Sequence, residues 1–213
     1  MNKDNVAWIA ITEHVSQILF VIFFSFFITN VGRKKILLAS NFFVVVGWWL
    51  LYLSDSLESI IISQLIMSMG SALFEVIAYT YIGELTSPRN RAILLTIALL
   101  LASIGTEIQF ALQLFDDYQL LSLVPLIIAT FSLIVSPFTL LESPYHLIMN
   151  GGHEEAMKIL STLYVDESST HVMMLYEDLQ RYAETENTDE ITYWHFFSTM
   201  SDTKTFVLSL IHI

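Results

Sequence analysis

Residues 81–92 read YIGELTSPRNRA, and they place a carboxylate, a proline and two arginines between long apolar stretches. Of the 213 residues in the chain, 54% are hydrophobic and only 14% are charged, and the mean hydropathy is +0.62. These values lie outside the usual range of a soluble globular domain. The sequence therefore predicts a membrane protein whose few charges gather in its connecting loops.

The composition also excludes several classes of function. The chain has no cysteine, so it has no disulfide scaffold, thiol nucleophile or thiolate metal site. Its net charge of -12 argues against nucleic acid as a partner, because phosphate binding needs clustered Lys and Arg. The six histidines are scattered, and no catalytic motif or glycine-rich phosphate loop occurs. We therefore expect no enzyme, no cofactor and no metal site.

Apolar windows close to the 20 or so residues of helix that cross a bilayer recur along the chain. They cover residues 8–29, 36–53, 60–81, 92–115 and 120–141. We predict an all-α, polytopic membrane helix bundle with about five full spans in residues 1–141. Residues 142–203 are polar, acidic and helix-prone, and residues 204–213 resemble the start of a truncated further span.

The basic residues predict the orientation of the bundle, because cytoplasmic loops retain Lys and Arg. They follow the first, third and fifth windows: Arg33, Lys34, Lys35, Arg89, Arg91, Lys158, Arg181 and Lys204. The opposite loops hold only acids: Asp55, Glu58, Asp116 and Asp117. The opening stretch and the helical segment 142–203 are therefore predicted to be cytoplasmic.

Three short motifs stand at the predicted cytoplasmic ends of the windows. They are Gly32-Arg33-Lys34, Tyr81-Ile82-Gly83-Glu84 with Arg91-Ala92, and Leu141-Glu142-Ser143-Pro144. In their order and spacing they resemble the signatures of the sugar porter family of the major facilitator superfamily, and most of all its insect facilitated trehalose transporter-like branch. The resemblance implies a partial major facilitator fold, limited to the N-terminal half without its first span, in a multi-pass protein of the plasma membrane.

The resemblance also implies roles for the charged loops. In sugar porters such residues form a cytoplasmic latch that closes and opens as the transporter alternates between its two faces. By position, the latch here comprises Gly32, Arg33, Lys34, Glu84, Arg91 and Glu142. Glu84 and Arg91 are seven residues apart across a short turn, so they could pair with each other or with neighbouring loops. The alternative is that these are ordinary topogenic and interfacial charges.

The implied activity is movement of a small-molecule sugar, hexose or trehalose, by alternating access without covalent chemistry. One departure is Leu99, which stands where the family has a glutamine that contacts sugar. Gln109 and Gln113 are weak candidates for lining a cavity, and could equally be interhelical contacts. Glu75 and Glu107 are acids well inside windows, so they could serve a proton relay or could be hydrogen-bonded interior groups.

A rival interpretation is that the chain transports nothing. Leu99 and the missing spans favour a non-transporting fragment or truncated paralogue that acts as an interaction protein, associated with an intact transporter. The lipid bilayer is a partner under both interpretations. Two further expectations are structural: the small residues Ser68, Gly70 and Ala72 permit close helix packing, and Pro125 and Pro137 would kink the last full window.

Overall fold

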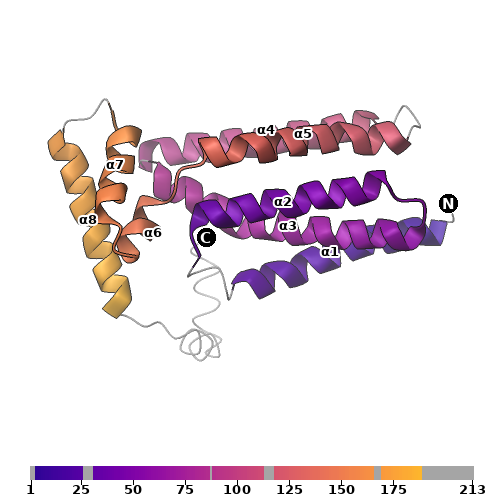
Figure 1. The fold of residues 1–213 in the computed structure, drawn as a ribbon, viewed down its shortest axis with the longest axis horizontal. Helices are drawn as coiled ribbons and strands as arrows, with labels where there is room; N and C mark the ends of the chain where they lie inside the picture. Colours follow the sequence, from indigo (N-terminus) through magenta and orange to yellow (C-terminus); the bar gives the residue numbers. More distant parts are fainter. Residues whose placement is uncertain (1–2, 26–30, 87, 113–117, 166–168, 189–213) are drawn as a thin grey trace, which may run out of the picture. The chain divides into compact units, whose positions relative to one another are not determined.

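The computed structural model describes residues 3–25, 31–86, 88–112, 118–165 and 169–188, and all the regular elements in these ranges are helices (Figure 1). They are α1 Lys3–Ser25, α2 Arg33–Tyr52, α3 Leu57–Leu85, α4 Pro88–Leu112, α5 Tyr118–Thr139, α6 Pro144–Met149, α7 His153–Leu163 and α8 Ser169–Thr188. The chain divides into two compact units, residues 1–147 and 148–213. Each unit is described by itself.

Four helices of the described residues are long and apolar enough to cross a membrane. They are α2, α3, residues 90–112 of α4 and residues 121–139 of α5. In α1 the apolar run with described side chains is shorter, Ile11–Ser25. The predicted all-α, polytopic helix bundle is confirmed. Residues 26–29 and 113–115 of the predicted windows, and the predicted further span at 204–213, lie outside the described residues.

The helix boundaries follow local chemistry. Ser56 caps α3: its hydroxyl accepts the N–H of Ser59 at 3.2 Å, and the Ser59 hydroxyl accepts the N–H of Ser56 at 3.3 Å. This reciprocal pair satisfies two backbone donors that a helix start leaves unpaired. Pro88 is the first residue of α4, where its missing N–H costs nothing and its fixed φ favours the helix. The helix therefore begins inside the stretch that the sequence suggested was a loop.

Helices α2 and α3 pack closely because small residues lie between them. A methyl group on Gly70 would lie 2.8 Å from the backbone oxygen of Ser40, and one on Gly47 would overlap Met67. Toward the start of α2 the two helices bury an apolar cluster: Ile36, Leu37, Leu73, Ile77 and Tyr81. The close packing predicted at Gly70 is confirmed.

In the first unit, α3 contacts α1, α2 and α4, while α5 contacts α2 and α4 (Figure 1). Among α1 to α5, helix α4 packs least against its neighbours, and its apolar side chains remain exposed along its length; Leu99 is 54% exposed. Such side chains suit contact with lipid tails. Helix α5 is continuous through Pro125 and Pro137.

In the second unit, α7 packs on α8. Gly151 precedes α7 with a φ of +77°, a conformation that glycine adopts without a steric penalty. Ala156 and Leu160 are buried on the inner face of α7. The Tyr176 hydroxyl of α8 lies 2.9 Å from His153 Nδ1 at the start of α7, so the two helices are also joined by a polar contact.

Candidate functional site

The motif residues meet at one end of the first unit, which we call the charged end and define as Arg33, Glu84, Arg91 and Glu142. Arg33 begins α2, Glu84 lies in the last turn of α3, Arg91 lies in the first turn of α4, and Glu142 follows α5. Residues that are 51 and 108 positions apart in the sequence make direct contact there. The structure therefore brings three of the predicted loops together.

Arg33 and Glu84 form a forked ion pair between α2 and α3. The Arg33 Nη2 atom lies 3.2 Å from Glu84 Oε1, and Nε lies 3.3 Å from both carboxylate oxygens. The side chains are only 13% and 18% exposed. An exposed ion pair contributes about 0–1 kcal/mol, but a guanidinium fork held away from water is stronger and geometrically more specific. This pair fastens α2 to α3.

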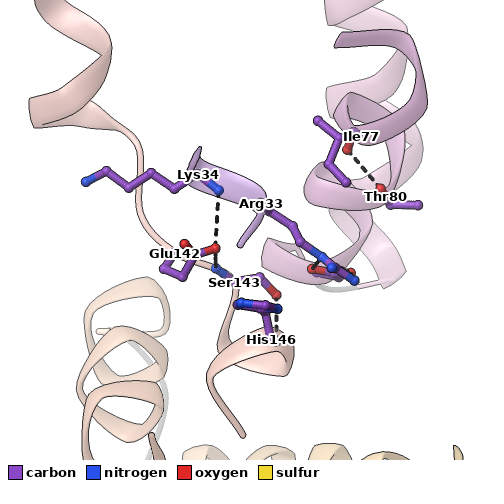
Figure 2. Close-up of polar contacts among 8 residues, drawn as sticks. Arg33, Lys34, Ile77, Thr80, Glu142, Ser143 and His146 are labelled. Atoms are coloured by element: carbon purple, nitrogen blue, oxygen red, sulfur yellow. Dashed lines mark hydrogen bonds and ion pairs between the residues drawn. The ribbon is translucent and has the colours of Figure 1, made fainter. Parts of the chain in front are cut away.

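Glu142 caps helix α2 from a distant part of the chain. Its Oε1 atom accepts the backbone N–H of Lys34 at 3.2 Å and that of Ser143 at 3.1 Å (Figure 2). The N-cap residue of α2 is Gly32, which has no side chain to accept these donors. A carboxylate is favourable at a helix N-terminus because of the free N–H groups and the helix dipole. Glu142 therefore ties the segment after α5 to the start of α2.

Lys34 takes part in the charged end through its backbone. Figure 2 shows its side chain pointing away from Glu142, while its backbone nitrogen faces the carboxylate. Arg91 donates to the backbone oxygen of Gly83 at 2.9 Å and closes the turn between α3 and α4. The sequence left open whether Glu84 pairs with Arg91 or with a neighbouring loop. In the structure Glu84 pairs with Arg33, at the start of α2.

A side chain at position 32 would displace the Glu142 carboxylate. A methyl group on Gly32 would be 2.6 Å from Glu142 Oε2 and 3.3 Å from His146 Nε2. The His146 backbone N–H donates to the hydroxyl of the buried Ser143 at 3.3 Å. The glycine of the first motif therefore makes room for the carboxylate of the third.

Burial lowers the pKa of His146 below the usual histidine value. The nearby Glu142 carboxylate opposes this and raises it, and Arg33, Glu84 and Lys35 act more weakly in alternating directions. Because desolvation disfavours the imidazolium, the neutral ring is the form that suits this packing. The His146 imidazole thus adds a titratable group next to the charged end.

A cavity of about 1060 Å³ opens among α1 to α5, on the membrane side of the charged end. Its polar lining is Glu13, Gln17, Ser40, Asn41, Ser71, Glu75, Thr106, Ser132, Ser136 and Thr139. Tyr81 and Leu140 also line it. The Tyr81 hydroxyl donates to the backbone oxygen of Leu141 at 2.8 Å, next to Glu142. Tyr81 therefore contacts both the cavity and the chain segment that caps α2.

Asn41 organises the polar side of the cavity. Its Nδ2 atom donates to the hydroxyl oxygens of Ser132 at 3.0 Å and Ser136 at 3.5 Å, which join α2 to α5. The two serines are four residues apart, on one face of α5. Asn41 and the two serines were not predicted from the sequence, although an asparagine within an apolar window is a recognisable signal for an interior polar position.

The intramembrane candidates differ in position. Glu75 lines the cavity, whereas Glu107, Gln109 and Leu99 are not among its lining residues. Gln109 donates to the backbone oxygen of Leu121 at 3.3 Å and so links α4 to α5. Gln113 lies outside the described residues. Among the described residues, no group of three or more His, Cys, Asp or Glu side chains could hold a metal ion.

The comparison with protein families agrees with this geometry. The family model described as "Sugar (and other) transporter" matches residues 3–213, nearly the whole chain. The chain belongs to the sugar transporter family. The motif resemblance to sugar porters is confirmed at the level of the family, and the family consists of membrane transporters rather than enzymes. A search of curated proteins found no match.

Proposed function

We propose that this member of the sugar transporter family moves hexose or trehalose across the plasma membrane by alternating access. In this proposal the cavity holds the substrate and the charged end is the latch that closes beneath it. The observation that carries the proposal is the position of Tyr81, which lines the cavity and bonds to the residue beside Glu142. A change at the cavity can thereby reach the latch through a single side chain.

The cavity offers the chemistry that sugar recognition needs. A sugar is bound by a few polar groups that converge on its hydroxyls and by apolar or aromatic surfaces against its ring faces. Asn41 and the two serines of α5 provide fixed polar groups, and Phe74 and Phe131 provide the aromatic surface. These residues supply polar contacts despite the leucine at position 99.

The latch has the strength that a reversible closure requires. It combines the Arg33–Glu84 ion pair with two hydrogen bonds that backbone N–H groups donate to the Glu142 carboxylate. Hydrogen bonds to charged groups contribute roughly 1.5–3 kcal/mol each when well shielded, and less when water competes. A few such contacts hold one state, yet remain within the range that substrate binding can overcome.

Uptake of radiolabelled glucose and trehalose by proteoliposomes that contain the full chain tests this function. We expect saturable uptake, reduced at least about tenfold by Asn41→Leu, because the substitution removes the amide that positions Ser132 and Ser136. Glu107→Gln is the matched control, since this exposed side chain on α4 is outside the cavity lining. Absence of saturable uptake of either sugar by correctly folded protein would refute the proposal.

A further inference from the structure

The lining of the cavity indicates a more specific class of substrate, sugars that carry a cationic group. We propose that it selects a hydroxylated solute that also carries a positively charged amino group, of which an amino sugar is the simplest example. This inference rests on the proposed function, because it assumes that the cavity is the substrate site. It is carried by the charge and by the hydrogen-bonding capacity of the lining residues.

In the described part of the chain, the lining contains two acidic residues, Glu13 of α1 and Glu75 of α3, and no Lys, Arg or His. Glu75 is ten residues before Leu85 at the end of α3, or about 15 Å along the helix. Glu13 lies near the start of the apolar run of α1, Ile11–Ser25. A carboxylate at the depth of Glu75 in a membrane is costly without a partner.

Several polar groups of the lining already use their donors within the protein. The hydroxyls of Thr106, Ser136 and Thr139 donate to backbone oxygens of their own helices at 3.1, 3.3 and 3.3 Å. Asn41 directs its amide nitrogen to the two serines, so its amide oxygen is the atom available to a ligand. With the two carboxylates, these groups present lone pairs, which match a ligand rich in N–H and O–H donors.

The spacing of the carboxylates gives the ligand a direction. The Ser68 hydroxyl lies 3.2 Å from the backbone oxygen of Glu13 and sets α1 level with that part of α3. Glu75 is seven residues beyond Ser68, about 10 Å along the axis. The two carboxylates therefore lie at different levels, and one can take an ammonium group while the other accepts from hydroxyls. Phe131 adds an aromatic face that also favours a cation.

Binding of three labelled sugars to the full chain in lipid nanodiscs tests this inference. The probes are D-glucosamine, its neutral N-acetyl derivative and D-glucose, at about pH 6.5, where an amine of ordinary basicity is charged. We expect D-glucosamine to bind at least about tenfold more tightly than the other two, the scale of one partly screened charge pair. Glu75→Gln should reduce this preference to about twofold or less, whereas the control Glu107→Gln should retain it.

The outcomes separate this inference from the function on which it rests. Saturable binding of D-glucose with no preference for D-glucosamine overturns the inference and leaves sugar binding in the cavity intact. Failure of all three sugars to bind folded protein overturns both. A preference that survives both Glu75→Gln and Glu13→Gln overturns the assignment to these carboxylates. The comparison of D-glucosamine with its N-acetyl derivative uses the wild-type chain, so it stands even if a variant does not fold.

Discussion

Substitution Glu142→Ala should open the latch, because Glu142 is the acceptor that ties the segment after α5 to the start of α2. It removes two hydrogen bonds, of 3.2 Å to the Lys34 N–H and 3.1 Å to the Ser143 N–H. Both bonds are only partly shielded from water, so each contributes about 1 kcal/mol net; with about 0.5 kcal/mol for the charge at the helix N-terminus, the loss is about 2.5 kcal/mol. This corresponds to a population of the open latch that rises by up to about 70-fold.

The chain provides a direct assay for this opening. It contains no cysteine, so Ile36→Cys introduces the single thiol, at a position only 4% exposed in the cluster between α2 and α3. Alkylation of this thiol should accelerate by about ten- to 70-fold when Glu142→Ala is added. Glu142→Gln retains a neutral acceptor and should have a smaller effect, of about 1 kcal/mol.

Lys34→Gln is the matched control for this experiment. The Lys34 side chain points away from Glu142 and only its backbone N–H takes part, so the substitution should leave the alkylation rate within about twofold. An equal acceleration by Lys34→Gln and Glu142→Ala would refute the capping account. So would an unchanged rate in Glu142→Ala with the helix content of the wild type.

Three further predictions concern the same bundle. Arg33→Lys keeps the charge but loses the forked contact with Glu84, and should lower the free energy of unfolding by about 1 kcal/mol in a denaturant titration; no change would show that the fork is not a strong contact. Gly70→Ala places a methyl group 2.8 Å from the backbone oxygen of Ser40 and should lower the free energy of unfolding by about 1–3 kcal/mol in the same titration. An unchanged midpoint would argue against close packing of α2 on α3. Burial lowers the pKa of His146, so the folded state binds fewer protons than the unfolded state. The stabilising contribution is complete above about pH 6.5 and is lost as the pH falls through the lowered pKa. Thermal melts of the wild type should therefore show a decline in stability on the acid side that His146→Gln reduces, and identical pH profiles of the two proteins would refute this role.

The sequence predicted the membrane helices and the grouping of their charges because both depend on local composition. Apolar windows near the length of a bilayer crossing predict helices whatever their neighbours are. Arg33, Glu84 and Glu142 stood out because charge is rare in this chain. Loop charges that follow alternate windows are brought to the same end of a bundle by the alternation of helix directions.

The partners of these charges depended on tertiary structure. Glu142 contacts a backbone N–H 108 residues away, and no local pattern indicates that a carboxylate will cap a helix whose own N-cap is glycine. Lys34 was selected from the sequence for its charged side chain, but it contacts Glu142 through its backbone N–H. The backbone N–H groups at a helix start need acceptors, and a sequence motif does not show which distant residue will supply them.

The lining of the cavity could not be predicted because it depends on the rotation of each helix. Glu75 and Glu107 are equivalent in the sequence, as acids within apolar windows, but only Glu75 faces the cavity. Gln109 turns toward α5 and bonds to its backbone. In a helix of apolar residues on all sides the periodic pattern is weak, so it does not indicate which face turns inward.

The central claim is that sugar in the cavity and the state of the charged end are coupled, and the alkylation rate of Ile36→Cys with and without sugar tests it most directly. In nanodiscs that contain the full chain, we predict a saturable change in this rate as D-glucose, trehalose or D-glucosamine is added up to about 10 mM, above the usual range of substrate affinities. Asn41→Leu should abolish the change. A rate that none of the three sugars alters, in protein with the helix content of the wild type, would contradict the account.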